Sequence, residues 1–377
     1  MAPSSYIKAR SNPQEEQVTV DGEAYFPFLH LDPDDEEESA KQVVTDCFQL
    51  EKDSAQVLKV TTVPGGITNR LFHVSGIDAR NYPSSVLVRI FGALGLIDRD
   101  VETSTYAALA KQGIALRYYG RFANGRLEEW LGGMKTLSES DMAVPEISKA
   151  IAQHVARLHS RFEIPEHLKE HHDPTKPPTL WTQLRSWLDQ SLASKFENDH
   201  DTQRAQALEL SKLNEELEWL RSTVVSKDAK VGFCHNDLLA ANILWCESSK
   251  TLQLIDFEYG GINYLSYDIA NHFNEFAGGT SGDATPDYTR FPSPELQRSF
   301  VTEYLSNIQA NEIPSTSQVD LLMKEIKGFV LANHLVWGLW AVNQAATEGC
   351  KEFDYLQYAT CRIRRYFFDK EDWEAMS

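Results

Sequence analysis

A single segment, residues 233–268, constrains this 377-residue chain more than any other part of its sequence. The segment reads FCHNDLLAANILWCESSKTLQLIDFEYGGINYLSYD, and three of its polar residues, Asp237, Asn242 and Asp256, stand at a telling spacing. Asp256 comes directly after a short apolar strand that the sequence predicts over residues 252–255. Proteins use this spacing for metal-assisted phosphoryl transfer.

The polar residues of this segment match the catalytic loop of kinases, His-x-Asp-x-x-x-x-Asn, at His235, Asp237 and Asn242. Phosphoryl transfer needs an acceptor hydroxyl held in line and phosphate oxygens neutralised by magnesium. We therefore expect Asp237 to orient and deprotonate the hydroxyl, with His235 and Asn242 in the same catalytic loop. Asp256 and the amide of Asn242 are the predicted ligands of Mg²⁺, a hard cation that prefers oxygen.

Aspartate and asparagine also close turns, and Asp237 or Asn242 alone would be interpreted in that way. The joint spacing, with Asp256 at the end of an apolar strand, favours a phosphotransferase site over this purely structural interpretation.

Length and charge narrow the class of protein further. A chain of 377 residues with 42% hydrophobic residues can bury a large core, and its length favours two lobes. The net charge of −19 argues against nucleic acid and anionic membranes as partners, because both require clustered Lys and Arg. A small cationic substrate would be attracted by this charge, although an acidic surface also serves solubility alone.

The five cysteines are scattered and show no Cys-x-x-Cys metal spacing, which favours a reducing compartment. The first 16 residues lack the apolar core of a secretory signal. An apolar stretch over residues 329–346 predicts a buried helix rather than a membrane span, because it is interrupted by Asn333, His334, Gly338, Asn343 and Gln344. We expect a cytoplasmic protein without stable membrane insertion, and the sequence leaves open whether it forms a homodimer.

The sequence predicts three regions along the chain. Residues 1–20 are polar, contain two prolines and are expected to be flexible. Residues 21–131 form a strand-rich N-lobe, and residues 132–377 form a larger, mostly helical C-lobe. Within the N-lobe, the acids at residues 32–38 suit the positive end of a helix predicted over residues 39–50.

Three segments of the N-lobe, residues 57–63, 70–75 and 86–91, are rich in β-branched residues and predict one antiparallel sheet. The turn between the first two could bring backbone amides and polar side chains to phosphates through Gly65, Gly66, Thr68 and Asn69. A plain hairpin loop explains these glycines equally well.

Apolar residues at helical spacing predict buried stripes over residues 147–162 and 213–224 of the C-lobe. His154 and His159 lie in the first of these helices without a partner pattern, so we assign them structural or surface roles.

The order of the motifs resembles that of the choline and ethanolamine kinase family, in particular its ethanolamine branch. The matching segments accompany the catalytic loop and are GGITN at residues 65–69, VLVRIFG at 86–92, NHFNEFAG at 271–278, HLVWGLWAVNQA at 334–345 and FDYLQYA at 353–359. The resemblance extends over roughly residues 55–370.

This resemblance implies a bilobal, protein-kinase-like α+β fold with an antiparallel sheet in the N-lobe and ATP between the lobes. Arg89 would replace the strand lysine of protein kinases and contact the nucleotide phosphates. Glu102 is the residue expected to orient Arg89, the alternative being an ordinary exposed carboxylate. The connector GRLEEWL would meet adenine through backbone groups between Glu129 and Leu131.

The resemblance also implies an amine site in the C-lobe. Glu275 would pair with an ammonium group, and aromatic faces would attract the same cation: Tyr259, Trp337, Trp340, Phe353, Tyr355 and Tyr358. Without the resemblance, a pair such as Trp337 and Trp340, one helical turn apart, would be interpreted as core packing.

The activity implied is the ATP- and Mg²⁺-dependent phosphorylation of ethanolamine to phosphoethanolamine, the first step of the CDP-ethanolamine route to phosphatidylethanolamine. GGITN and NEFAG favour ethanolamine over choline by resemblance alone, because a phosphate loop cannot contact the amine. A choline kinase or a dual kinase remains an alternative. The sequence also leaves open a phosphotransferase that acts on a different alcohol, such as an aminoglycoside, and a catalytically silent member of the fold.

Overall fold

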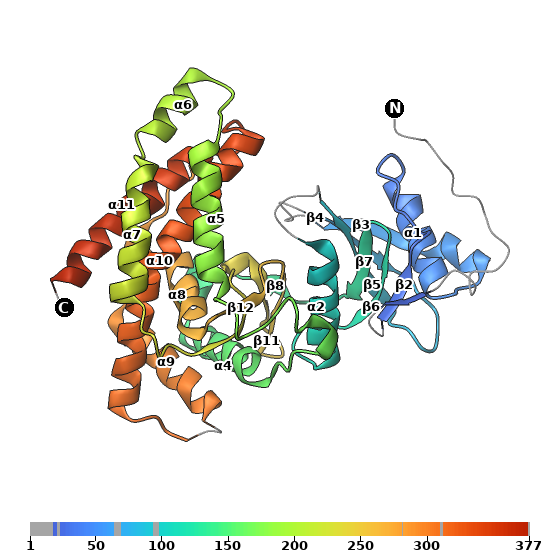
Figure 1. Ribbon diagram of the computed structural model, residues 1–377. Helices are drawn as coiled ribbons and strands as arrows, with labels where there is room; N and C mark the ends of the chain where they lie inside the picture. Colours follow the sequence, from blue (N-terminus) through green and yellow to red (C-terminus); the bar gives the residue numbers. More distant parts are fainter. Residues whose placement is uncertain are drawn as a thin grey trace. The chain divides into compact units, whose positions relative to one another are not determined.

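The computed structural model describes residues 18–20, 23–63, 69–92, 98–280, 282–309 and 312–375 (Figure 1). The chain divides into two compact units. The sheet unit comprises Met1–Gly133 and Pro165–Leu168, and the helical unit comprises Met134–Ile164 and Lys169–Ser377. One larger, mainly helical part and one smaller part with a large sheet give the α+β class that the sequence predicts.

The sheet unit contains a seven-stranded sheet in the order β1-β2-β6-β7-β5-β4-β3. Neighbouring strands are antiparallel except for β2 and β6, which pair in parallel. The strands are β1 (Val18–Val20), β2 (Glu23–Phe26), β3 (Lys59–Val63), β4 (Asn69–Ser75), β5 (Ser85–Phe91), β6 (Tyr118–Phe122) and β7 (Gly125–Glu129). Its helices are α1 (Glu36–Cys47), η2 (Lys52–Val57), α2 (Arg99–Lys111) and η3 (Glu166–Leu168).

The three predicted strands of the N-lobe correspond to β3, β4 and β5, so this part of the sheet is confirmed. Residues 52–57 instead form the short helix η2, so β3 begins two residues later than expected. The parallel pairing of β2 with β6 was not expected from the sequence. The predicted glycine turn at residues 64–68 lies outside the described residues.

Helix α1 covers the apolar core of the sheet unit. Its first turn carries three acids that suit the positive end of the helix dipole, as the sequence predicts. Val43 and Val44 on α1 are buried in one cluster with Val74, Val86 and Val88 of the central strands. This burial fixes the central strands, and β5 carries Arg89.

The helical unit holds most of the remaining chain. Its main helices are α3 (Glu139–Met142), α4 (Pro145–Arg161), α5 (Thr179–Ala193), α6 (Asp199–Gln206), α7 (Leu213–Trp219), α8 (Leu265–Glu275), α9 (Pro294–Ile308), α10 (Thr316–Glu348) and α11 (Tyr355–Glu374). Short helical turns are η4 (Leu210–Lys212), the π-helix η5 (Leu220–Val224), η6 (Ala240–Asn242) and η7 (Tyr288–Arg290). Two small sheets, β11-β10-β8 and β12-β9, consist of β8 (Lys135–Thr136), β9 (Val231–Cys234), β10 (Ile243–Cys246), β11 (Thr251–Leu254) and β12 (Gly261–Tyr264).

Helix α10 is the central helix of this unit and packs against α5, α8 and α11. The polar residues that interrupt its apolar stretch have partners inside the protein: Asn343 donates to the carbonyl of Trp187 at 3.1 Å, and His334 bonds to Asp369 at 3.2 Å. A side chain at Gly338 would place its Cβ 3.0 Å from Ile363, so glycine permits the close approach of α11. None of the described helices is long and apolar enough to cross a membrane.

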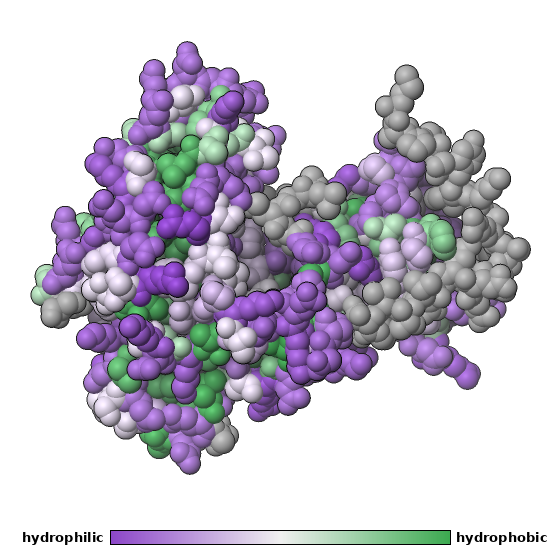
Figure 2. Space-filling view, viewed as in Figure 1, coloured by the Kyte–Doolittle hydropathy of each residue, from purple (hydrophilic) through white to green (hydrophobic). Residues whose placement is uncertain are grey.

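Hydrophilic residues cover most of the visible face of the helical unit (Figure 2). An open groove of about 820 Å³ runs along α5 and α7 and is lined by residues that include Trp181, Leu184, Leu217 and Arg221. Hydrophobic side chains are exposed between these two helices (Figure 2). The groove includes none of the site residues that the sequence predicts.

Candidate active site

The catalytic loop follows strand β9 in the helical unit. The loop begins at His235 and ends in the short helical turn η6, which closes with Asn242. Two polar residues of this region, Asn236 in the loop and Asp256 after β11, have positive φ angles of 66° and 62°, where Asn and Asp are enriched. Unusual backbone angles at such residues are typical of functional sites, because the surrounding structure must hold them in place.

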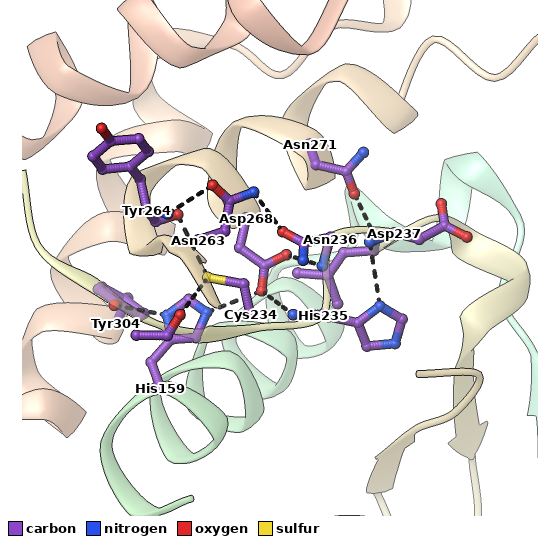
Figure 3. Close-up of polar contacts among 12 residues, drawn as sticks. His159, Cys234, His235, Asn236, Asp237, Asn263, Tyr264, Asp268, Asn271 and Tyr304 are labelled. Atoms are coloured by element: carbon purple, nitrogen blue, oxygen red, sulfur yellow. Dashed lines mark hydrogen bonds and ion pairs between the residues drawn. The ribbon is translucent and has the colours of Figure 1, made fainter. Parts of the chain in front are cut away.

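Asp268, on α8, holds the start of this loop. Its carboxylate accepts hydrogen bonds from the backbone N–H groups of His235 at 2.8 Å and Asn236 at 2.7 Å (Figure 3). His159 donates to the same carboxylate at 2.9 Å and lies 2.9 Å from the hydroxyl of Tyr304. Burial would raise the pKa of Asp268, but the His159 hydrogen bond and neighbouring charges lower it, so this group stays ionised.

These contacts give His159 the structural role that the sequence suggests. His159, Cys234 and Asp268 come within 4.8 Å of one another, close enough to resemble a metal site (Figure 3). The Cys234 thiol donates to the carbonyls of Tyr264 at 3.5 Å and Gly232 at 3.7 Å, so all three residues have hydrogen-bond partners inside the protein. The cluster is therefore hydrogen-bonded support for the catalytic loop.

One face of α8 continues these contacts. The side-chain oxygen of Asn271 accepts from the N–H of Leu238 at 2.5 Å, and His272 donates to the carbonyl of Leu238 at 3.2 Å. Together with Asp268 and Glu275, these residues repeat at intervals of three and four, the spacing of one helix face. The pattern D-x-x-N-H-x-x-E is the signal in the sequence that could have identified this face.

Asp237 lies beside Asn242 in a buried, acidic environment. The Asn242 side-chain N–H group donates to the Asp237 carboxylate and to its carbonyl, each at 3.0 Å. The pKa of Asp237 is well above its usual range because of burial first, and then because of the charges of Glu275, Asp256 and Glu258. The amide nitrogen of Asn242 is thus used by Asp237, and the amide oxygen is the atom of this side chain that could bind a metal ion.

His235 connects the catalytic loop to Asp256. Its Nε2–H donates to the carbonyl of Ile255 at 2.9 Å, and Nδ1 accepts from the N–H of Asp237 at 3.3 Å. The N–H of Ile255 in turn donates to the carbonyl of Asn242 at 2.9 Å. The sequence places His235 among the catalytic residues, but both ring nitrogens bond within the protein and the side chain is fully buried. His235 therefore links the backbone of Asp237 to that of Ile255, the residue before Asp256.

The oxygen groups gathered here suit a divalent cation. Asp256, Glu258 and Glu275 all raise the pKa of Asp237, which reflects the negative charge concentrated around this group. Mg²⁺ prefers carboxylate and amide oxygens of this kind. Glu258 was not singled out from the sequence, although it is the second acid to follow strand β11.

The six aromatic residues predicted for the amine site form one chain of ring contacts, which we call the aromatic cluster. Their rings meet in edge or tilted geometry with centroids 4.9–6.1 Å apart, in the order Tyr259, Trp337, Trp340, Tyr355, Phe353 and Tyr358. The backbone carbonyl of Tyr259 accepts from the side chain of Asn236 at 2.9 Å. One end of the aromatic cluster therefore touches the catalytic loop.

The other end of the aromatic cluster meets a buried arginine that was not predicted from the sequence. Arg362, on α11, donates to the hydroxyl of Tyr358 at 3.1 Å and forms an ion pair with Glu275 at 3.4 Å. Glu275 thus has a cationic neighbour within the protein, whereas the sequence predicts only an ammonium partner. The sequence could have indicated Arg362 because it follows Tyr358 by four residues on the same helix, a spacing that brings two side chains together.

In the sheet unit, Arg89 belongs to a buried network of charges. Its Nε–H donates to Glu128 at 2.8 Å, and the same carboxylate oxygen accepts from Arg126 at 2.6 Å. Glu102 accepts from Arg126 at 2.5 Å and was expected to orient Arg89 directly. The carboxylate that bonds directly to Arg89 is that of Glu128. Glu102 bonds to Arg126, which in turn bonds to Glu128.

The strands hold this network closely. Gly125 on β7 faces Ile90, and the Cβ of any side chain there would clash with the carbonyl of Arg89. Charges on Arg89 and Arg126 lower the pKa of Glu128 although its burial acts in the opposite direction, so the carboxylate is ionised. Both features fix the backbone and the side chain of Arg89.

Of the remaining residues predicted to bind nucleotide, the structure describes Asn69, Glu129 and Leu131. Gly65, Gly66 and Thr68 fall outside the described residues, and Asn69 is described only through its backbone, which pairs with Phe91 in the sheet. Glu129 ends β7 and accepts from the backbone N–H of Arg117 at 3.2 Å. Leu131 follows two residues later and is half-buried.

Known proteins resemble this chain over most of its length. A probable choline kinase 2 of Arabidopsis thaliana is 35% identical over 323 residues, covering 84% of this chain and 87% of its own. A probable ethanolamine kinase of the same plant is 33% identical over 312 residues, covering 82% and 79%. A solved structure of an ethanolamine kinase from Plasmodium vivax aligns with a TM-score of 0.73 at 26% identity, covering 87% of this chain and 88% of that one.

These similarities confirm the protein-kinase-like fold that the motifs imply. The family model described as choline/ethanolamine kinase matches residues 60–367, which include the catalytic loop, the aromatic cluster and the buried charges around Arg89. The chain belongs to the choline/ethanolamine kinase family.

Proposed function

We propose that this protein transfers the γ-phosphoryl group of ATP to the hydroxyl of ethanolamine. The observation that carries the proposal is the pairing of a buried carboxylate base, Asp237, with a second buried carboxylate, Glu275, whose charge acts on it. One acid can serve the hydroxyl end of a small amino alcohol and the other its ammonium end. Membership of the family supports the reaction class.

In the proposed reaction Asp237 accepts the proton of the substrate hydroxyl. The hydroxyl oxygen forms a bond to the γ-phosphorus, and the bond from this phosphorus to the bridging oxygen of the β-phosphate breaks, which releases ADP. The raised pKa of Asp237 makes it a stronger base than an ordinary aspartate. Its hydrogen bond from Asn242 keeps one carboxylate oxygen oriented while the other takes the proton.

Asp256 and the side-chain oxygen of Asn242 are the groups we assign to Mg²⁺. The metal ion would supply positive charge to the phosphate oxygens as charge develops in the transition state. We assign ATP to the phosphate turn with Gly65, Gly66, Thr68 and Asn69, to Arg89, and to the backbone from Glu129 to Leu131. Glu128 then serves as the residue that orients the Arg89 guanidinium.

Choline is the second candidate substrate, alone or together with ethanolamine. The aromatic cluster favours it, because a quaternary ammonium has no N–H donor and depends on aromatic faces. The carboxylate of Glu275 favours ethanolamine, whose primary ammonium donates hydrogen bonds. Relatives of both kinds resemble the chain to a similar degree, so the preference for ethanolamine rests on the chemistry of the amine site.

The purified chain with ATP and Mg²⁺ should form ADP in the presence of ethanolamine and, at a lower kcat/KM, of choline. Kanamycin serves as the aminoglycoside arm, and Asp237→Asn as the catalytically impaired control. Phosphorus NMR of the product identifies phosphoethanolamine. Turnover of kanamycin alone would contradict the proposal. An Asp237→Asn variant that turns over the amino alcohols as fast as the unmodified chain would contradict it too.

A further inference from the structure

Arg362 is a fully buried cation in the helical unit with no assigned part in phosphoryl transfer. An isolated buried charge is costly, and such a residue persists where its geometry is well defined by partners. Arg362 and two of its partners lie on three different helices. Arg362 lies on α11, its ion-pair partner Glu275 ends α8, and the amide oxygen that it bonds most closely belongs to Asn333 on α10.

Asn333 fixes the position of the guanidinium. Nη2 of Arg362 donates to the Asn333 side-chain oxygen at 2.7 Å and to its backbone carbonyl at 3.4 Å. The amide of Asn333 is itself held, since it accepts from Asn274 at 2.8 Å and donates to the Tyr267 hydroxyl at 3.2 Å. The cation therefore cannot follow Glu275 when the carboxylate moves, and its charge stays at one edge of that group.

The two oxygens of Glu275 are consequently not equivalent. Nη1 of Arg362 lies 3.4 Å from Oε1, and within the described part of the chain no hydrogen bond reaches Oε2. Glu275 is only 4% exposed, and Oε2 is not among the enclosed polar atoms without a partner, so this oxygen keeps part of the small accessible surface. Burial raises the pKa of Glu275 despite the neighbouring Arg362, which is consistent with a carboxylate that has room for one more cationic donor.

We propose that Arg362 is a specificity-determining residue of the amine site, which occupies the Oε1 edge of Glu275 and leaves Oε2 as a single acceptor for one N–H of the substrate. This inference rests on the proposed function, because it concerns the same carboxylate. A carboxylate with two open oxygens would bind two N–H groups of a primary ammonium. A carboxylate with one open oxygen would bind only one N–H group.

The number of N–H donors on the substrate tests this directly. Ethanolamine, N-methylethanolamine, N,N-dimethylethanolamine and choline carry three, two, one and no N–H groups on a cationic nitrogen at neutral pH. With one acceptor, the KM values of the first three should agree within about threefold, and the last methylation should raise KM at least about tenfold, since a charged hydrogen bond is lost. The value of kcat should change little, because the hydroxyl end is the same in all four.

This series uses the unmodified full chain, so it does not depend on the folding of any variant. A tenfold rise in KM at the first or second methylation, or an even rise in KM over all three, would overturn the single-acceptor arrangement. Equal KM values for all four amines would overturn it too, because the aromatic cluster alone would then select the cation. Absence of turnover with every one of the four would contradict the proposed function instead.

Arg362→Met supplies the complementary test, and Arg364→Met on the exposed side of the same helix is the matched control. Removing the guanidinium opens both oxygens of Glu275, so a second rise in KM, at the change from two N–H groups to one, should appear in addition to the rise at the loss of the last N–H. Arg364→Met should keep the unmodified pattern. A folded Arg362→Met, checked by its circular dichroism and melting, whose KM rises only at the loss of the last N–H would refute the role of Arg362.

Discussion

At the residue scale, the helical unit concentrates negative charge around the group proposed as the base. The pKa of Asp237 is raised by burial, and the carboxylates of Glu275, Asp256 and Glu258 raise it further. A base must be ionised before it can accept a proton. The cations proposed to bind beside it, Mg²⁺ and the substrate ammonium, would lower the pKa of Asp237 and thus prepare it for the reaction.

Asp237→Asn should fold and bind substrates but lose at least about 10²-fold in kcat, the lower range of a general-base contribution. The asparagine side chain keeps the shape and still accepts the Asn242 hydrogen bond, but it cannot take a proton. Asp228→Asn, an exposed acid in the same unit, is the control. Steady-state kinetics with both variants measure the effect, and a near-parental kcat for Asp237→Asn would rule out this base.

The same substitution should stabilise the protein without metal or substrate. An acid whose pKa is raised on folding destabilises the folded state once the pH exceeds the pKa of that acid in the unfolded chain. The reason is that ionisation is less favourable in the folded protein than in the unfolded chain. Asparagine removes that ionisation. In EDTA at pH 7 the melting temperature of Asp237→Asn should exceed the parental value, and the difference should shrink as the pH falls toward 4. A lower melting temperature at pH 7 would contradict a destabilising charge on Asp237.

The proposed metal ligands should respond differently to substitution. Asp256→Ala removes a charged ligand and should abolish activity at every Mg²⁺ concentration, whereas Asn242→Ala removes a neutral one and should recover partly at high Mg²⁺. A magnesium titration of both variants compares the two. If both keep the parental Mg²⁺ dependence, the metal ion is held by other residues.

At the element scale, pairs of strands and helix faces determine where the charged groups lie. Strands β5 and β7 run side by side, and Arg89 and Arg126 face each other in their register. Glu128, two residues after Arg126, bonds to both arginines. Arg89 and Arg126 thus share the carboxylate of Glu128, and Glu102 from α2 supplies a second carboxylate, which bonds to Arg126.

Glu128→Gln should therefore affect both stability and nucleotide binding. Removing one member of a buried ion pair leaves an uncompensated charge and costs about 3 kcal/mol in the free energy of unfolding. Because Glu128 orients Arg89 directly, its loss should also raise the KM for ATP at least about tenfold. Denaturant unfolding and ATP kinetics measure the two effects.

Glu102→Gln distinguishes direct from indirect orientation of Arg89. It should lower stability through Arg126 but change the KM for ATP less than Glu128→Gln does. Asp78→Asn, at an exposed acid of the same unit, should do neither. If Glu102→Gln raises the KM for ATP more than Glu128→Gln, the partner expected from the sequence is the functional one.

At the scale of the whole molecule, the parts with strong local patterns were predictable from the sequence. Three strands of the sheet, the buried stripe of α4 and the buried character of α10 follow from the spacing of apolar residues. Two polar residues that interrupt the apolar stretch of α10 have partners on other helices, which accounts for their burial. The convergence of Asp237 and Asn242 follows from their fixed spacing in one short loop.

The pairings between distant segments were not predictable in this way. Glu275 and Arg362 are 87 residues apart in the chain, and only the packing of α8 against α10 and of α10 against α11 brings them together. The choice of Glu128 over Glu102 for Arg89 depends on strand register. The parallel pairing of β2 and β6 likewise joins segments that have no common pattern in sequence.

The two ends of α8 have different tasks, and this has a consequence for the length of the substrate. Asp268 anchors the loop that carries Asp237, and Glu275 lies seven residues further on the same face, ~10.5 Å along a rigid helix. Under the proposed function, α8 would set the distance between the residues that bind the hydroxyl end and the ammonium end of an amino alcohol. Lengthening the substrate by one methylene, as in 3-aminopropan-1-ol, should lower kcat/KM by about 10- to 200-fold relative to ethanolamine. Equal kcat/KM values for the two alcohols would mean that flexible loops, and not the helix, set the distance between the two ends.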